Sequence, residues 1–302
     1  MNILFTGASS CTGMHFVQEL ALRGHKITCV FTRHPKDYHG IRKVRIQKIL
    51  PYIHPIWNTK FGEPSFCTLL KKNNFDTYAH HMAWTKGYGT EQYDIEFAIR
   101  NNTHQLSKVI DILLQQRCFQ IILTNSVFEG KDIICEGGNA PFEPHGTAKK
   151  ETTEVFLQFS SIIPIRRFII PNPIGTFDNV RLLEYLHTSW QRQENPHIRY
   201  PNNVRDNIPI PYLRKRYVHF VEESSMHTAP SGWIKSNRDF VQKIASEFRK
   251  RFSYETTCLF GPQIDSQQPI RLHNTEPMPK MHDESKFWDT LCEHYKSRFG
   301  TG

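Results

Sequence analysis

The sequence predicts an α/β fold built on a doubly wound parallel sheet, with a smaller C-terminal substrate lobe. Two observations support this prediction. Residues 1–31 read as a short apolar strand, an amphipathic helix and a second strand, and strand-like and helix-like segments continue to alternate through residues 75–123. A chain of 302 residues is also long enough to bury one large core with an additional lobe.

The N-terminal strand–helix–strand unit is the clearest element. Residues 3–5 form an apolar strand, residues 16–22 carry the apolar face of a helix, and residues 27–31 form the second strand. Gly24 lies where a glycine commonly ends a helix. The turn at residues 7–13 holds only small side chains, so backbone N–H groups at the helix start are accessible to a pyrophosphate.

This turn resembles the T-G-x-x-G-x-x-G signature of the extended short-chain dehydrogenase/reductase family, with Ser10 in place of the middle glycine. The resemblance implies a Rossmann-like domain in which Gly7, Ser9, Ser10 and Gly13 bind the cofactor. The alternative is an ordinary tight turn between a strand and a helix.

The residues after the second strand indicate which cofactor to expect. Enzymes that use NAD place a carboxylate there against the ribose 2′-hydroxyl, whereas enzymes that use NADP place a basic residue. This chain has Arg33 and no acidic residue before Asp37. We therefore expect NADP(H) in preference to NAD(H), with Arg33 on the 2′-phosphate. The alternative is that Arg33 is only a surface cation.

Two further segments resemble cofactor-lining parts of the family. Residues 75–83 resemble its fourth strand, D-x-V-I-H-x-A-A, which implies that Met82 and Ala83 line the cofactor and that His80 is structural. Residues 167–175 resemble the segment R-x-x-N-x-x-G, which closes over the nicotinamide and implies a cofactor contact from Asn172.

The segment after the strand at residues 119–123 resembles the family's S-S-x-x-V-Y-G, which carries the catalytic hydroxyl. Counting back from Val127 puts Thr124 in that position, with Ser126 as the fallback and a substrate contact.

The family's next motif is Y-x-x-x-K, but residues 145–149 read His-Gly-Thr-Ala-Lys, and no tyrosine in the chain is followed by a lysine four positions later. The resemblance then implies that His145 replaces the catalytic tyrosine and that Lys149 keeps its role on the nicotinamide ribose.

A histidine can perform general acid–base chemistry, because its unperturbed pKa is about 6.5. A nearby lysine ammonium opposes formation of the imidazolium, however, and an imidazole reaches less far than a phenol. Two hypotheses stay open: an enzyme in which His145 works beside Thr124 and Lys149, or a protein that binds the dinucleotide without chemistry and acts as a regulator or scaffold.

The second half resembles a substrate lobe. Residues 215–221 resemble the family strand R-D-x-x-H-V, which makes Lys215 the candidate for the substrate diphosphate; a cationic strand edge is the alternative. Ser236 begins a helix with a capping pattern, and a C-terminal helix carries an apolar stripe around Trp288. We expect an NADP-binding domain at residues 1–170 and a substrate lobe at 171–302, with 215–245 returning to the first core.

The resemblance implies an NADP(H)-dependent reductase or epimerase that acts on a nucleotide-activated sugar or a similar anionic carbonyl compound. Homodimers through paired helices are common in the family. The net charge of +9 suits such an anionic partner. We do not expect a nucleic-acid partner, although a basic protein that reuses the fold for other partners is a third hypothesis.

The sequence also predicts what the protein lacks. It shows no signal peptide and no apolar stretch long enough for a bilayer, so we expect a cytoplasmic protein without a membrane partner. Its seven cysteines are widely spaced, without C-x-x-C, and its sixteen histidines include no H-E-x-x-H. We expect neither a disulfide framework nor a metal site.

Overall fold

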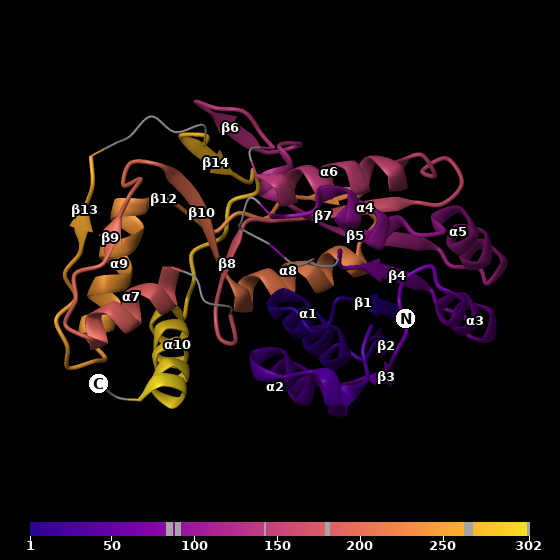
Figure 1. Cartoon of the computed structure of the whole chain (residues 1–302), viewed down its shortest axis with the longest axis horizontal. Helices are drawn as coiled ribbons and strands as arrows, with labels where there is room; N and C mark the ends of the chain where they lie inside the picture. The colour runs from indigo at the N-terminus through magenta and orange to yellow at the C-terminus, as the bar shows by residue number, and fades with distance from the viewer. Residues whose placement is uncertain (83–86, 88–91, 142, 179–181, 263–267, 301–302) are drawn as a thin grey trace. The chain divides into compact units, whose positions relative to one another are not determined.

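The computed structural model covers residues 1–302 and describes all of them except 83–86, 88–91, 142, 179–181, 263–267 and 301–302. The chain forms two compact units, which are both discontinuous in sequence (Figure 1). Unit 1 contains residues 1–131, 140–170 and 214–229, and unit 2 contains residues 132–139, 171–213 and 230–302.

Unit 1 is built on a seven-stranded sheet in which every neighbouring pair is parallel. The strand order is β11-β7-β5-β4-β1-β2-β3, so the chain moves outward from β1 in one direction and then returns to the other side. This order is that of a Rossmann-like sheet and confirms the predicted fold class. The strands are β1 (Asn2–Thr6), β2 (Lys26–Val30), β3 (His54–Ile56), β4 (Thr77–His80), β5 (Gln120–Ser126), β7 (Ile165–Ile170) and β11 (His227–Thr228).

Helices cover both faces of this sheet. On one face the rings of Phe16 and Tyr217 stack 4.0 Å apart, and both pack against Phe168 of β7. On the other face an apolar cluster joins Tyr78 of β4 to Phe156 and to other helix residues. The first face carries α1 (Cys11–Leu22), which packs on α2 (Gly40–Ile49), and α8 (Ile210–Glu222); the second carries α3 (Pro64–Lys72), α5 (Leu106–Gln115) and α6 (Pro144–Leu157), with α4 (Ile95–Thr103) against α6. Short 3-10 helices are η1 (Pro35–Asp37), η2 (Leu50–Tyr52) and η3 (Val127–Glu129).

Helix α1 ends where the sequence predicts. Gly24 has a φ of +88°, which favours glycine, and its N–H donates to the carbonyl of Ala21 at 2.9 Å. The next N–H, of His25, donates to Leu20 at 3.2 Å. These bonds satisfy carbonyls that the helix end would otherwise leave unpaired.

Two element predictions are wrong. Residues 101–113 read from the sequence as one long amphipathic helix, with an apolar face that includes Leu106, Val109 and Ile110. They form parts of two helices, because Gln105 adopts a left-handed conformation with φ +53° between α4 and α5. The strand expected at 215–221 is part of α8. Its buried residues Leu213, Tyr217 and Phe220 recur at helical spacing, so the period of the apolar residues outweighs the resemblance to a strand motif.

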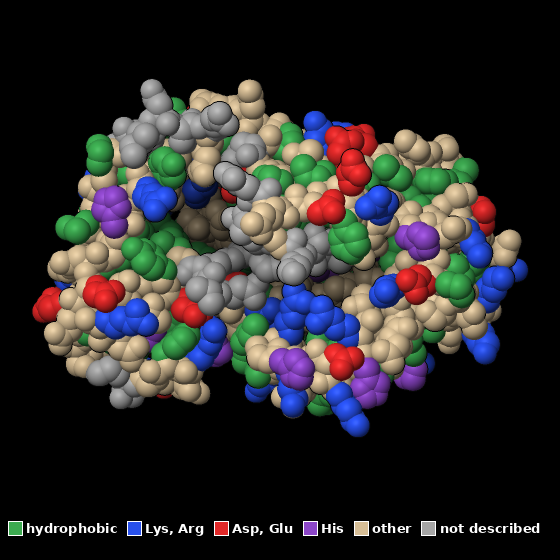
Figure 2. Space-filling model, in the orientation of Figure 1, with side chains coloured by type: hydrophobic (Ala, Val, Ile, Leu, Met, Phe, Trp, Pro, Cys, Tyr) green, Lys and Arg blue, Asp and Glu red, His purple; other side chains and the backbone are tan. Residues whose placement is uncertain are grey.

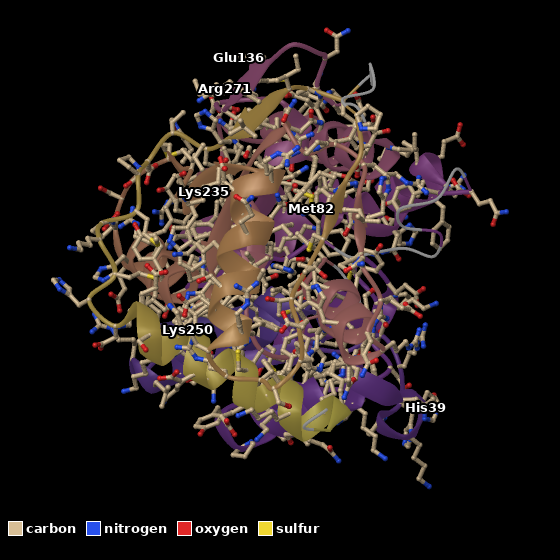
Figure 3. The ribbon with its side chains drawn as sticks, turned by 90° about the vertical axis from the view of Figure 1, so that its left-hand side faces the viewer. His39, Met82, Glu136, Lys235, Lys250 and Arg271 are labelled. Carbon is tan, nitrogen blue, oxygen red and sulfur yellow. The ribbon has the colours of Figure 1, made fainter. Side chains whose placement is uncertain are left out.

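Unit 2 contains a five-stranded mixed sheet. Its order is β12-β10-β14-β6, and β8 pairs with β10. The antiparallel pair β6–β14 carries an ion pair between Glu136 and Arg271, 3.4 Å apart, which are labelled next to each other in Figure 3. The strands are β6 (Ile134–Glu136), β8 (Asn172–Ile174), β10 (Val204–Pro209), β12 (Trp233–Ser236) and β14 (Arg271–His273), while β9 (His197–Ile198) and β13 (Leu259–Phe260) form a separate pair.

Three helices of unit 2 share an aromatic core. They are α7 (Leu182–Gln191), α9 (Asn237–Arg249) and α10 (Glu284–Phe299), and their buried faces meet in one cluster. Ser236 caps α9 by accepting the N–H of Asp239 at 3.1 Å, which confirms the predicted helix start. The stripes predicted for α9 and α10 are buried: Phe240, Val241, Ile244, Ala245 and Phe248, and Phe287, Trp288, Leu291 and Tyr295.

Basic side chains are spread over the face of the molecule that Figure 2 shows. On the face shown in Figure 2, lysine and arginine side chains occupy several separate positions among acidic, apolar and polar groups. Within the described residues, no helix combines the length and the apolar character that a membrane crossing requires.

Candidate functional site

The turn between β1 and α1 depends on two glycines. Gly7 has a φ of +78°, and a Cβ placed on it would lie 2.5 Å from the carbonyl oxygen of His81. A Cβ on Gly13 would lie 2.4 Å from the carbonyl oxygen of Gly7. Since real Cβ atoms do not approach backbone this closely, larger residues would force the turn to open. The glycines of the predicted signature therefore set the shape of this turn.

Ser10 has a structural role in the same turn. It is the N-cap of α1, and its Oγ accepts the N–H of Gly13 at 3.0 Å. The protein itself thus uses one of the amides at the helix start. Other first-turn amides have no partner within a helix, and Ser9 and Ser10 are only half-buried. The turn therefore fits a linked diphosphate, with one amide fewer than a glycine at position 10 would leave.

The end of β4 adjoins this turn through His81. Its Nε2 lies 3.2 Å from the hydroxyl of Thr12 on α1. Nδ1 of His80 lies 2.6 Å from the hydroxyl of Tyr78. Burial, reinforced by the charge of Lys149, lowers the pKa of each histidine to about 3, so both are neutral at physiological pH. The predicted structural role of His80 agrees with this environment.

Two residues after β4, Met82 and Ala83, are predicted to line the cofactor. Met82, which is labelled in Figure 3, is buried, while Ala83 lies outside the described residues.

Lys149 connects α6 to the end of β5. Its Nζ donates to the carbonyl oxygen of Thr124 at 2.8 Å. Burial lowers the pKa of Lys149, and the nearby carboxylate of Glu129 opposes that shift. Conversely, burial raises the pKa of Glu129, and Lys149 counteracts it. The lysine and the glutamate therefore form a buried pair whose charges offset one another.

Glu129 is held by a network that the sequence analysis missed. Its carboxylate accepts the side-chain N–H of Asn125 at 2.5 Å and the backbone N–H of Ser126 at 2.7 Å. Thr153 of α6 donates to the same carboxylate at 3.4 Å. The sequence carries one signal for this network, since Glu129 directly follows an apolar segment that ends at Phe128. An acidic residue in such a position is buried only when other groups bond to it.

The two predicted hydroxyls lie in different environments. Thr124 points to the α1/α8 face, where its fully buried hydroxyl neighbours the phenol of Tyr217. Lys149 reaches Thr124 from the other face and contacts only its carbonyl. Ser126 ends the strand and is half-buried, and its Oγ accepts the N–H of Phe128 at 3.3 Å. Of the two, only Ser126 is partly exposed.

His145 lies in the first turn of α6, directly after Pro144 at its first position. The imidazole is 6 % exposed, and its Nδ1 lies 3.1 Å from a carboxylate oxygen of Glu143. The ring of Phe128 packs edge-on against it with centroids 5.1 Å apart. Because residues four apart share a helix face, His145 and Lys149 are neighbours on α6.

Three predicted residues remain to be placed, two in unit 1 and one in unit 2. Arg33 is exposed after the end of β2, and Lys215 is exposed on α8. Asn172 belongs to unit 2, where it pairs with Asn207 across β8 and β10. A further cation was missed: Arg45 of α2 is buried, and its guanidinium donates to the carbonyl oxygen of Ser9 at 3.4 Å.

The ends of β1, β4 and β5 lie side by side in the sheet, so the Gly7–Gly13 turn, His81 and Lys149 meet at one edge. In open parallel sheets the carboxyl edge is where ligands bind, at the point where the strand order reverses. The fold and this edge define a Rossmann-like α/β protein with a candidate dinucleotide site. Among the described residues, no three His, Cys, Asp or Glu side chains group as metal ligands would.

Several solved structures have a fold similar to that of this chain. UDP-glucose 4-epimerase from Thermotoga maritima, solved with UDP-glucose, has 12% identity and a TM-score of 0.76 over 99% of both chains. UDP-glucuronic acid 4-epimerase from Bacillus cereus, in complex with UDP-glucuronic acid and NAD, has 14% identity and a TM-score of 0.72 over 99% of this chain and 100% of that one. UDP-N-acetylglucosamine 4-epimerase from Methanobrevibacter ruminantium has 12% identity and a TM-score of 0.73 over 99% of both.

These likenesses show that the chain has the fold of the extended short-chain dehydrogenase/reductase type, as the sequence predicts. Neither the models of protein families nor the curated proteins give a match to this sequence.

Proposed function

We propose that this protein is a nicotinamide-dinucleotide-dependent enzyme that epimerises a nucleotide-activated sugar through a keto intermediate. The observation that carries the proposal is the position of Lys149, which bonds to the end of β5 one helical turn from His145, at the carboxyl edge where the Gly7–Gly13 turn also lies. Solved proteins of the same fold, covering 99% of this chain, are titled UDP-sugar 4-epimerases.

We assign a separate role to each of several residues of unit 1. The amides of the β1–α1 turn bind the pyrophosphate, and Met82 lines the cofactor. Lys149 orients the nicotinamide ribose, as the family resemblance implies. A bound dinucleotide accepts and returns hydride. Ser126, in preference to the enclosed Thr124, donates a hydrogen bond to the substrate oxygen.

His145 performs the proton transfer in this proposal. It accepts the proton of the sugar hydroxyl as the carbon loses hydride, and it returns the proton when the keto group is reduced. Unit 2 is the substrate lobe in this proposal. The family resemblance assigns Asn172 to the cofactor and Lys215, on α8 in unit 1, to the substrate diphosphate.

The cofactor is NADP(H) in this proposal, because Arg33 follows β2 where an NAD enzyme carries an acidic residue. The Bacillus cereus relative is titled as a complex with NAD. Parallel fluorescence titrations with NADPH and NADH therefore test the choice: tighter binding of NADPH supports Arg33 as the 2′-phosphate contact, and equal or weaker binding removes that role.

The experiment that tests the function is turnover of UDP-sugars by the wild type and by the His145→Phe variant. We expect epimerisation by the wild type and a loss of at least about 10²-fold in kcat for the variant, the usual size of a general acid–base contribution. NADPH binding should persist in both. His219→Phe, at an exposed position of α8, is the matched control.

One alternative has support of its own. The enclosed hydroxyl of Thr124 and the bond from Gly13 to Ser10 both depart from a working family site and favour a protein that binds the dinucleotide without chemistry. Binding of NADPH by a wild type that turns over no UDP-sugar would support this alternative and end the enzyme proposal.

A further inference from the structure

We infer that Glu143 is a positioning residue for His145: its carboxylate holds the imidazole by Nδ1 and so makes Nε2 the nitrogen that exchanges the proton. The inference rests on the proposed function, in which His145 is the acid and base. It adds a second residue to that chemistry, because the tyrosine that His145 replaces has only one proton site, whereas an imidazole has two and needs a partner to select one.

The backbone explains why the Glu143 side chain is available for this contact. Glu143 is the N-cap of α6 in an extended conformation, φ −122° and ψ 144°, and its carbonyl accepts the N–H of Thr147 at 3.2 Å. Side chains at this position usually accept a first-turn amide. Among the described contacts, the Glu143 carboxylate makes no such capping bond, and an oxygen lies 3.1 Å from Nδ1 of His145 instead.

The imidazole is fixed from a second side by η3. Phe128 packs edge-on against it. Gly146 allows the close approach, because a Cβ there would lie 2.5 Å from the carbonyl oxygen of Phe128. The side chain of His145 is 7% exposed and that of Glu143 is 34% exposed, so solvent reaches the carboxylate but hardly reaches the ring.

The neighbouring charges leave Glu143 as the group that balances an imidazolium. On its own helix His145 shares a face with Lys149, four positions further on, and from η3 it contacts Phe128; the part of α4 packed on α6 is apolar, at Ala98. Lys149 and Glu129 offset each other. A carboxylate that accepts from Nδ1–H both fixes the tautomer and stabilises the positive ring that forms.

The proton step balances with this assignment. During oxidation Nε2 takes the proton of the sugar hydroxyl, the O–H electron pair forms the C=O bond, and the carbon's hydrogen leaves with two electrons to the oxidised nicotinamide. The imidazolium remains beside the Glu143 carboxylate. In the return step the hydride adds to the other face of the carbonyl, and Nε2 gives its proton back to the oxygen.

The test combines a spectroscopic and a kinetic measurement on the full chain. Two-dimensional ¹⁵N–¹H spectra identify which nitrogen of His145 carries the proton at neutral pH. We compare the wild type with Glu143→Gln, which keeps an acceptor but loses the charge, and with Glu143→Ala, which loses both. Glu151→Gln, an exposed carboxylate on the same helix, is the control.

We expect the Nδ1–H tautomer in the wild type and in Glu151→Gln, and a shift toward Nε2–H in Glu143→Ala. With a UDP-sugar that the wild type epimerises, kcat should fall about 10-fold in Glu143→Gln and about 10²-fold in Glu143→Ala, with KM changed less than about twofold. Recording the pH profile of kcat for each variant adds a readout that a merely structural role would not move.

An Nε2–H tautomer in the wild type, or variants with an unchanged kcat and pH profile, would overturn the inference. If the wild type epimerised no sugar, the proposed function and the proton-transfer role would fail together. The tautomer would still decide separately whether Glu143 sets the proton position on His145.

Discussion

At the scale of single residues, exposure distinguishes the two hydroxyls of β5. Successive side chains of a strand point to opposite faces, so Asn125 points toward Thr153 of α6 while Thr124 points toward Tyr217 of α8. The proposed acid–base residue His145 lies on α6. Ser126, two positions further on, belongs to the same side of the strand as Thr124, but it is the last residue of β5 and is partly exposed, which separates it from the enclosed Thr124.

This separation predicts opposite outcomes for two substitutions. Thr124→Val should leave kcat within about threefold of the wild type and should not lower stability, since it removes a buried hydroxyl that the described residues do not bond. Ser126→Ala should lower kcat about 10- to 100-fold. Steady-state kinetics with thermal unfolding as a control would check both. A large loss of kcat in Thr124→Val with Ser126→Ala unaffected would reverse our assignment.

The residue scale also shows what sequence reasoning can and cannot reach. His145 and Lys149 were predicted from the resemblance to the family motif Y-x-x-x-K, and their spacing of four positions gives them a shared helix face. Counting along a motif could not tell which face of β5 carries Thr124, since one position along a strand reverses the side. Glu143 and Glu129 were missed because their roles depend on contacts with other elements.

At the scale of elements, the β1–α1 turn shows a compromise between helix capping and ligand binding. Ser10 stabilises α1 by accepting the Gly13 N–H, and a serine-to-glycine change at an N-cap costs only a few tenths of a kcal/mol. That change would also release the amide to a phosphate.

We therefore expect Ser10→Gly to bind NADPH several-fold more tightly with nearly unchanged thermal stability. Isothermal titration calorimetry of the two proteins measures the difference, and Ser9→Gly, in the same turn but outside the cap, is the control. Weaker or equal binding by Ser10→Gly would mean that the pyrophosphate does not use the Gly13 amide.

The elements of the fold followed from the sequence where the apolar period was read directly. The βαβ unit, the Gly24 helix end and the α9 stripe all came from local patterns. The two errors arose elsewhere. The strand around Lys215 was predicted from a motif, although the apolar residues of that segment recur at helical spacing. The break between α4 and α5 lies at Gln105, and no glycine or proline marks it in the sequence.

At the scale of the whole molecule, buried neutral histidines make stability depend on pH. His80 and His81 in unit 1 have a pKa of about 3, and His187 in the aromatic core of unit 2 has a pKa of about 4, each lowered by burial. An unfolded chain binds a proton at each below about pH 6.5. The folded state does not, so stability is complete above pH 6.5 and falls as the pH decreases toward 3–4.

Each of these histidines should contribute a slope of up to about 1.4 kcal/mol per pH unit in that window. Urea unfolding between pH 7 and 5 would measure it. His187→Phe should reduce the slope by about one proton for the transition of unit 2, while His282→Phe, at an exposed position, should not. An equal slope in His187→Phe would show that His187 takes up its proton in the folded state as well.

The discontinuity of unit 1 has a consequence for synthesis on the ribosome. When residue 170 has been made, six of the seven strands of the parallel sheet exist, but Phe16 and Phe168 still lack the helix that brings Tyr217 onto them. Residues 171–213, which belong to unit 2, must be translated first. During that interval a nascent chain of this protein therefore exposes an aromatic face of the sheet. This is the stage at which a chaperone that shields apolar surface would bind it.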